Sequence, residues 1–74
     1  MIPRQSDVLE TRSRYRVGSR VVLVFINDAQ APPVGTKGTV NYVDDIGTIH
    51  VNWDNGSTLG VVFGEDRVWM IGED

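Results

Sequence analysis

The segment from Asp44 to Gly56, with the sequence DDIGTIHVNWDNG, constrains the fold most strongly, because it reads as a β-strand with a turn signal at each end. Ile49, Val51 and Trp53 occupy alternate positions, so they share one face of a strand, and the polar residues between them share the other. The stretch 54–56 contains residues that tolerate positive φ, as a tight two-residue hairpin turn requires. The segment therefore predicts a β-hairpin with Trp53 in the core.

The same two-residue periodicity recurs along the chain and predicts an all-β fold. Runs rich in β-branched and aromatic residues predict five strands, at Arg20–Ile26, Thr36–Val43, Thr48–Trp53, Ser57–Phe63 and Arg67–Ile71. Gly38 within the second run indicates a bulge or a close approach by another segment, and Phe25 in the first run is expected in the core. Five short strands with one long first loop predict a small five-stranded SH3-like barrel.

A short N-terminal helix or basic arm is expected ahead of this barrel. Asp7 followed by Glu10 resembles a capping box, which predicts a helix of at most two turns. We therefore expect an arm or short helix over residues 1–17 and the barrel over residues 18–74. Charge is unevenly divided, because residues 1–20 carry five arginines and two acids, whereas residues 21–74 carry two cations and eight acids.

Composition restricts the class of protein. A chain of 74 residues has room for one domain with one core. The absence of cysteine removes disulfide scaffolds, thiolate zinc sites and cysteine nucleophiles, and it agrees with a cytoplasmic location. The longest apolar run, Val21–Ile26, has six residues, whereas a membrane helix needs roughly 20. No membrane partner and no signal peptide are expected.

Catalytic and metal-binding patterns are weak. His50 is the only histidine, and strand alternation places it on the outer face, where it is expected to be solvated. The carboxylates of Asp44 and Asp45 lie at one end of a strand and that of Asp54 at the other, which predicts that they cannot share a cation. We expect no enzymatic activity, no cofactor and no metal.

Several contiguous motifs resemble a known family. APPVGTKGTV, then VDDIGTIHVNWDNGSTL, then GED, is similar to the small bacterial family called domain of unknown function 4314, whose members occur in phages, conjugative elements and Gram-positive genomes. The resemblance runs from about Arg14 to about Met70. A more distant similarity, in the GTKGTV and VNWDNG motifs, is to SH3-like domains of the mind-bomb and KOW kinds. These relatives imply an SH3-like fold that binds peptides, proteins or nucleic acid, and they imply no catalysis.

The first long loop and the aromatic residues supply candidate binding groups. Asp28, Pro32, Pro33 and Lys37 belong to the loop or border it, and long loops on rigid small barrels often carry recognition residues. The alternative is that the two prolines only cover an open barrel edge. Two further candidates, Tyr42 and Trp69, could line an aromatic groove for an extended peptide, or could instead fill the ends of the core.

The arginines of the arm, Arg12, Arg14 and Arg16, are the last candidates. They either fold back on the acidic barrel and neutralise it, or contact phosphate or an acidic protein surface. The leading hypothesis is a non-enzymatic SH3-like protein-interaction module of a bacterial phage or mobile element. The alternatives are a nucleic-acid-associated accessory protein that uses the arm for phosphate contacts, and a small inhibitor of a host enzyme.

Overall fold

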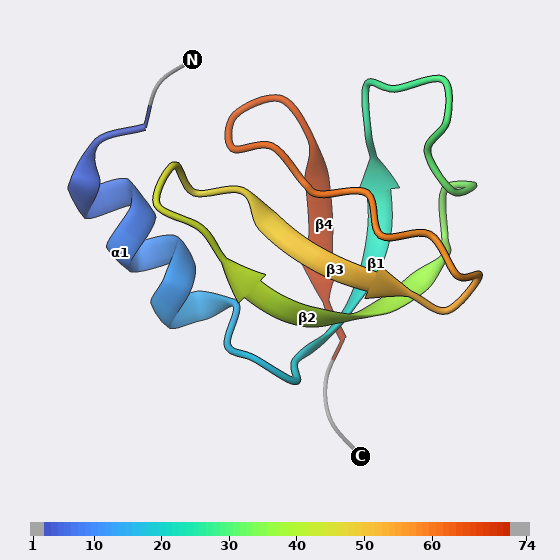
Figure 1. Cartoon of the computed structure of the whole chain (residues 1–74), viewed down its shortest axis with the longest axis horizontal. Coiled ribbons are helices and arrows are strands. Elements are labelled where there is room, and N and C mark those ends of the chain that lie inside the picture. The colour runs from blue at the N-terminus through green and yellow to red at the C-terminus, as the bar shows by residue number, and fades with distance from the viewer. Residues whose placement is uncertain (1–2, 72–74) are drawn as a thin grey trace.

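The computed structural model describes residues 3–71, which form one short helix and one antiparallel sheet (Figure 1). Helix α1 spans Gln5–Arg14, and the strands are β1 (Arg20–Phe25), β2 (Lys37–Val43), β3 (Ile49–Trp53) and β4 (Arg67–Met70). The strand order is β3-β2-β1-β4. A mostly β fold with a short N-terminal helix is confirmed. The outer ends of both predicted domains, residues 1–2 and 72–74, lie outside the described residues.

The prediction of a fourth strand over Ser57–Phe63, and with it the count of five strands, is wrong for this structure. Only Val61 forms a bridge, with Ile49, through backbone hydrogen bonds of 2.8 and 2.9 Å. The carbonyl of Leu59 accepts a 2.8 Å bond from the side chain of Trp53, through Nε1, where a regular ladder would supply a backbone amide. In addition, Gly60 lacks a side chain that could pack on a sheet. This stretch therefore follows the edge of β3 without forming a regular strand, and the sheet is open.

The core lies on one face of the sheet. Trp53 is 3% exposed, so its predicted core position is confirmed. Among residues 3–71, the hydrophobic core consists of ten buried residues, which are Val8, Val21, Leu23, Val40, Val43, Ile49, Val51, Trp53, Val61 and Val68. Phe25 was expected among them, but it is 49% exposed. The register of β1 against β4 shifts between Leu23 and Phe25, and this bulge turns Phe25 to the outer face.

The turn after β3 differs from the predicted two-residue type. Among the described residues no non-glycine residue has positive φ, so Asn55 does not, whereas Gly56 has φ of 94°. The amide of Gly56 donates to Trp53 O at 2.9 Å, and the amide of Trp53 donates to Ser57 O at 2.9 Å. The connection is therefore a three-residue loop, 54–56, in which only the last residue needs the left-handed region.

Helix α1 begins earlier and is longer than predicted. It has ten residues, its N-cap is Arg4, and Asp7 occupies the third helical position, where its carboxylate accepts the Arg4 amide at 3.0 Å. The acid of the capping box is thus Asp7 itself, not Glu10. Val8 is the buried residue of the helix. Within residues 3–71 no helix has the length and apolar character of a membrane span.

Candidate binding surface

An exposed tryptophan marks the outer face of the sheet. Trp69 of β4 is 68% exposed, and the strand register places it opposite Val22 of β1, which in turn lies opposite Lys37 of β2. Phe25 lies opposite Arg67. Phe25 and Trp69 therefore occupy diagonal positions on this face, a relationship in which residues are typically about 7–8 Å apart. We call the surface formed by these five residues the Trp69 face.

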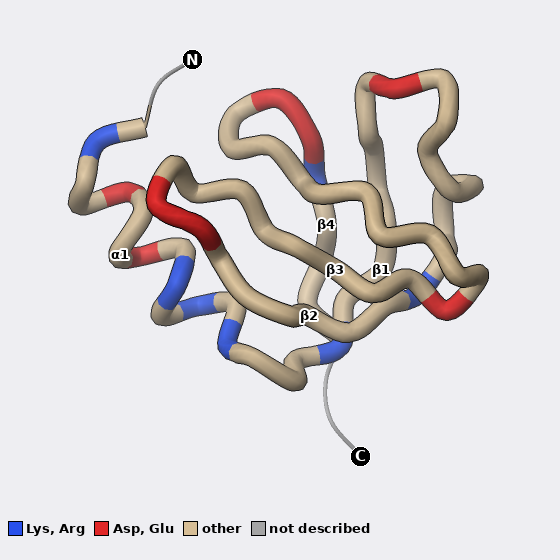
Figure 2. The backbone as a smooth tube through the Cα atoms, in the orientation of Figure 1, with Lys and Arg blue, Asp and Glu red and all other residues tan. Residues whose placement is uncertain are grey.

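The acidic residues between residues 21 and 71 all lie in connecting loops (Figure 2), at 28, 44, 45, 54, 65 and 66. Both cations of this region, Lys37 and Arg67, lie on the Trp69 face. Neither cation is ion-paired to another described residue. The Trp69 face therefore combines exposed aromatic surface with free positive charge, although the chain as a whole has net charge −3.

Arg20 lies beside the Trp69 face, but its charge is paired with that of Asp54. Its guanidinium binds both carboxylate oxygens of Asp54, at 2.6 and 2.8 Å, and also donates to Thr39 Oγ1 at 2.9 Å. The hydrogen bonds between Arg20 and Asp54 raise the pKa of Arg20 and lower that of Asp54. Because both groups are exposed, the pair fixes geometry more than it adds stability. The charge of Arg20 is neutralised by Asp54, whose pKa the charge of Lys37 also lowers. Among the described residues, Lys37 and Arg67 are the cations of the Trp69 face that form no ion pair.

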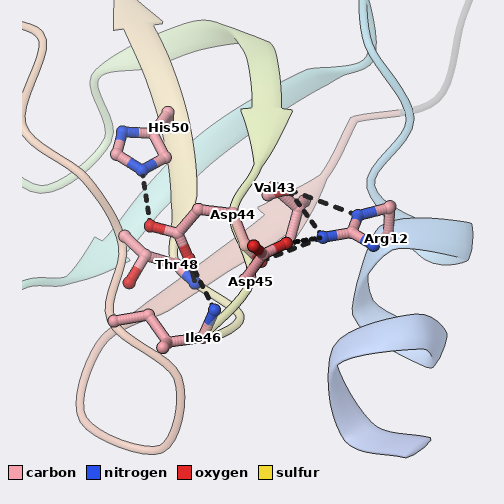
Figure 3. A network of polar contacts seen from close by, with 7 residues as sticks. All are labelled: Arg12, Val43, Asp44, Asp45, Ile46, Thr48 and His50. Carbon is pink, nitrogen blue, oxygen red and sulfur yellow. Dashed lines mark hydrogen bonds and ion pairs between the residues drawn. The ribbon is translucent and has the colours of Figure 1, made fainter. Parts of the chain in front are cut away.

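A polar network at the β2–β3 turn is built around Asp44 (Figure 3). Its carboxylate accepts the amides of Ile46 and Thr48 at 3.1 and 2.9 Å, and His50 Nε2 lies 2.8 Å from it. An ionised carboxylate only accepts, so Nε2 carries the proton in this contact. Burial would raise the pKa of Asp44, but the hydrogen bonds from His50, Thr48 and Ile46 outweigh this effect and lower it.

His50 is consequently not the solvated group that alternation predicted. Its side chain is 31% exposed, and its ring stacks on Tyr42 with centroids 4.2 Å apart and an interplanar angle of 6°. The arrangement of Asp44, His50 and Tyr42 brings an acid, an imidazole and a phenol ring together on neighbouring strands. Its visible role is to hold the turn between β2 and β3.

Arg12 holds the helix against this same turn. Its guanidinium donates to the carbonyls of Val43 and Asp44 at 3.2–3.3 Å and lies 3.4 Å from Asp45 Oδ1 (Figure 3). Of the two interpretations of the arm, Arg12 therefore fits folding back onto the acidic region. Arg14 and Arg16 are exposed and form no ion pair within the described residues.

Two recesses lie between the N-terminal segment and β4. The first has a volume of about 340 Å³, and it is lined by Arg14 and Tyr15 on one side and by Arg67 and Val68 on the other. The second, of about 780 Å³, lies between residues 16–20 and the end of β4, with Arg16, Arg20 and Met70 in its wall. Each recess therefore contains two arginines.

The candidates in the first loop are arranged as follows. Asp28 caps its own loop by accepting the Gln30 amide at 2.8 Å, and Pro32 is buried. Pro33 is exposed, and its carbonyl accepts both the amide and the hydroxyl of Thr36. The loop is thus internally ordered. Of the four candidates, only Lys37, the first residue of β2, belongs to the Trp69 face. The structure does not gather the predicted candidates into one site.

Sequence reasoning missed Phe25 and Arg67 as surface partners of Trp69. A β-bulge leaves no clear signal in one sequence, so the exposure of Phe25 could not be inferred. The position of Arg67 two residues before Trp69 was a usable signal, because residues two apart share one strand face. Among the described residues, no group of three or more potential ligands could hold a metal ion.

The geometry is that of a small open-sheet domain with an N-terminal helix and an outward aromatic face. The family described as Domain of unknown function (DUF4314) matches residues 4–71, nearly the whole chain, and the chain belongs to this family. Neither a curated protein nor a solved structure gives a match.

Proposed function

We propose that this chain is a non-enzymatic protein-interaction module with an SH3-like arrangement, used in the cytoplasm by a bacterial phage or mobile element. The observation that carries the proposal is Trp69, whose 68% exposed side chain stands on a hydrogen-bonded strand beside Phe25. Tryptophan and arginine dominate the binding energy of protein interfaces. A rigid sheet also presents them at low entropic cost.

The SH3-like part of the proposal is supported by the order of the elements. A long connection, residues 26–36, follows β1, short turns follow β2 and β3, and the segment 57–61 runs along β3. The chain then bends at 62–66 before β4 returns to pair with β1. This order is similar to that of a five-stranded SH3-like barrel, with the segment 57–61 in the place of the fourth strand, and it supports the SH3-like part of the proposal.

The partner surface that fits the Trp69 face is apolar at its centre and acidic around it. Val22, Phe25 and Trp69 supply the apolar centre, and Lys37 and Arg67 supply unpaired positive charge. Complementary charge guides encounter, while burial of aromatic surface supplies affinity. The partner of this module is therefore a protein that presents acidic and apolar side chains together.

Capture of partners from a lysate of the source bacterium tests the proposal when it is done with matched variants. We expect Trp69→Ser to lose specific partners that the parent chain retains. Ile46→Ser is the control, because Ile46 is 65% exposed but lies in the β2–β3 turn, away from β4. Equal capture by the parent and Trp69→Ser would overturn the assignment of this face.

A second candidate function is binding of single-stranded nucleic acid. The observation that favours it is the combination of exposed aromatic rings with free cations, which is how such strands are held by stacking and phosphate contacts. The overall charge of −3 opposes it. Fluorescence anisotropy with labelled single- and double-stranded oligonucleotides at about 150 mM salt, where the Debye length is about 8 Å, decides between the two candidates. Micromolar binding that Trp69→Ser abolishes would favour nucleic acid.

A further inference from the structure

Strand β4 is a sheet edge with no second strand beside it. In the order β3-β2-β1-β4, its ladder partner is β1. The opposite edge, β3, is covered by the segment 57–61 through bonds at Ile49, Val61 and Trp53. Within residues 3–71, no backbone hydrogen bond joins β4 to a segment on its other side. The outer edge of β3 is therefore hydrogen-bonded to another segment, whereas the outer edge of β4 is not bonded to any other part of residues 3–71.

The register identifies which backbone groups of β4 face outward. The amide of Ile71 donates to Arg20 O at 2.9 Å, and the strand register continues from this pair to Val22 and Trp69. In an antiparallel ladder, hydrogen-bonded and non-hydrogen-bonded pairs alternate. Val68 and Met70 belong to the non-hydrogen-bonded pairs, so their N–H and C=O groups point away from β1.

Val68 and Met70, whose backbone groups point away from β1, each border a recess with arginine in its wall. Val68 lies in the wall of the 340 Å³ recess with Arg14 and Arg67, and Met70 lies in the wall of the 780 Å³ recess with Arg16 and Arg20. Glu10 and Asp66 also line the first recess, but Asp66 is occupied by the amides of Asn27 and Val62 at 3.0 and 2.8 Å. Arg14, Arg16 and Arg67 are exposed and form no ion pair with a described residue.

We propose that an extended, acidic segment of a partner protein binds along β4 as an added strand. Its backbone would pair with the outward groups of Val68 and Met70, and its acidic side chains would meet Arg14, Arg16 and Arg67. An added strand places a cross-strand side chain directly beside Trp69, where an apolar residue packs. This inference rests on the proposed function, since it specifies the partner and the mode of binding for the same side of the sheet.

Charge complementarity selects this occupant over a second copy of the chain. A two-fold interface through β4 would bring each arginine-lined edge against its own copy. Like charges that face one another across an interface oppose association. An acidic strand meets the same groups with attraction, and exposed edge strands are the usual sites of such addition.

A synthetic peptide, acetyl-Glu-Val-Glu-Thr-Glu-Val-Glu-amide, provides the test. Trp69 is exposed and Trp53 is 3% exposed, so a shift in tryptophan emission on titration reports contact at Trp69. We expect saturable binding below about 1 mM, and no binding of the same peptide with lysine in place of glutamate. The double variant R14A/R16A should weaken binding roughly two- to thirtyfold, since it removes two exposed ion pairs that each contribute about 0.2–1 kcal/mol.

Two reagents separate strand addition from attraction between charges. A peptide N-methylated at alternate residues keeps its charge but loses the donors of one edge, and it should not bind. Met70→Pro removes an outward N–H that β1 does not use, and proline is tolerated on edge strands. This variant should keep its melting temperature and lose the peptide. Undiminished binding of the methylated peptide, or by a folded Met70→Pro chain, would overturn the proposal.

The remaining outcomes are also decisive. Binding of an oligothymidylate that competes with the peptide and depends on Arg14 and Arg16 would assign the edge to phosphate instead. Dimerisation in sedimentation that Met70→Pro abolishes would assign it to a second copy. If captured partners depend on Trp69 while no peptide binds, strand addition fails and the interaction function stands. If capture is also independent of Trp69, both proposals fail.

Discussion

Gly38 lies directly opposite Trp53 in the β2–β3 ladder, and a Cβ atom at Gly38 would lie 2.8 Å from Trp53 Cε3. The same atom would lie 2.5 Å from Val51 Cγ1. Because both neighbours are buried in the core, neither can move away without disturbing its own packing. The absence of a side chain at Gly38 therefore allows the indole to lie over β2.

This relationship predicts that Gly38→Ala destabilises the domain. Overpacking a core by one methyl group typically costs about 1–3 kcal/mol, and we expect a loss in that range in the free energy of unfolding measured by urea titration. Asn41→Ala on the same strand is the control, because Asn41 is exposed and should change stability by less than about 0.5 kcal/mol. Equal stability of the parent and Gly38→Ala would mean that Trp53 packs elsewhere.

Trp53→Ala should cost about 3–5 kcal/mol, as large-to-small changes of buried aromatic residues do. The change also removes the Nε1 bond to Leu59 O, which holds the segment 57–61 against β3. Small domains have roughly 5–15 kcal/mol in total, so the variant is expected to be partly unfolded at room temperature by circular dichroism. Trp53→Phe keeps an aromatic ring and should lose less. A fully folded alanine variant would contradict the core assignment.

Gly56→Val should also destabilise the fold, for a backbone reason. Gly56 has φ of 94°, and a Cβ atom added there would have no neighbour within 4 Å, so the penalty comes from conformation alone and is about 1–3 kcal/mol. Gly56→Asn is the matched variant, because asparagine visits positive φ more readily. A thermal melt should rank the glycine, asparagine and valine forms in that order. Any other order would refute the turn geometry.

The sequence predicted those features of the fold that depend on local pattern. Alternation placed Val51 and Trp53 in the core, and the position of Gly38 indicated a close approach, because both effects act between near neighbours in a ladder. The exposure of Phe25 depends on a bulge in β1. The irregular segment 57–61 is held to β3 in part by the indole bond from Trp53 to Leu59 O. Neither the bulge nor the bond from an indole to a carbonyl produces a recognisable pattern in the sequence.

The candidate surface was predictable only in part, for a related reason. Trp69, Lys37 and the arm arginines were recognisable as aromatic or cationic residues. Their grouping depends on strand register and on the path of the segment 14–20 past β4. The role of Arg12 in holding the helix could not be predicted from the sequence either, since its guanidinium donates to carbonyls that lie 31 and 32 positions away along the chain. Long-range partners of this kind are set by tertiary structure.

Acid should destabilise the domain through Asp44. Its pKa is lower in the folded state than in the unfolded chain, so the stability it contributes is fully present above the unfolded value of about 3.8–3.9 and is lost as the pH falls through the folded pKa. Unfolding curves measured between pH 6 and pH 2.5 should show a decline that Asp44→Asn flattens. Asp45→Asn is the control, because the Asp45 side chain is fully exposed. Parallel curves for the parent and Asp44→Asn would remove Asp44 as the source.

Removing the Arg12 side chain should release helix α1 without unfolding the sheet. The helix is held by buried Val8 and by the bonds from the Arg12 guanidinium to the Val43 and Asp44 carbonyls, and bonds to charged donors contribute about 1.5–3 kcal/mol. In Arg12→Ala, amide hydrogen exchange should become faster within residues 5–14 and remain unchanged in β1 and β2. Arg16→Ala should leave both regions as they are. If the helix stays protected in Arg12→Ala, then Val8 alone anchors it.

The same variant also bears on the recess beside β4. Arg14 and Tyr15 lie at the end of helix α1 and line this recess, so release of the helix would widen it. The effect of Arg12→Ala on binding of the acidic peptide therefore measures how far the helix shapes that site.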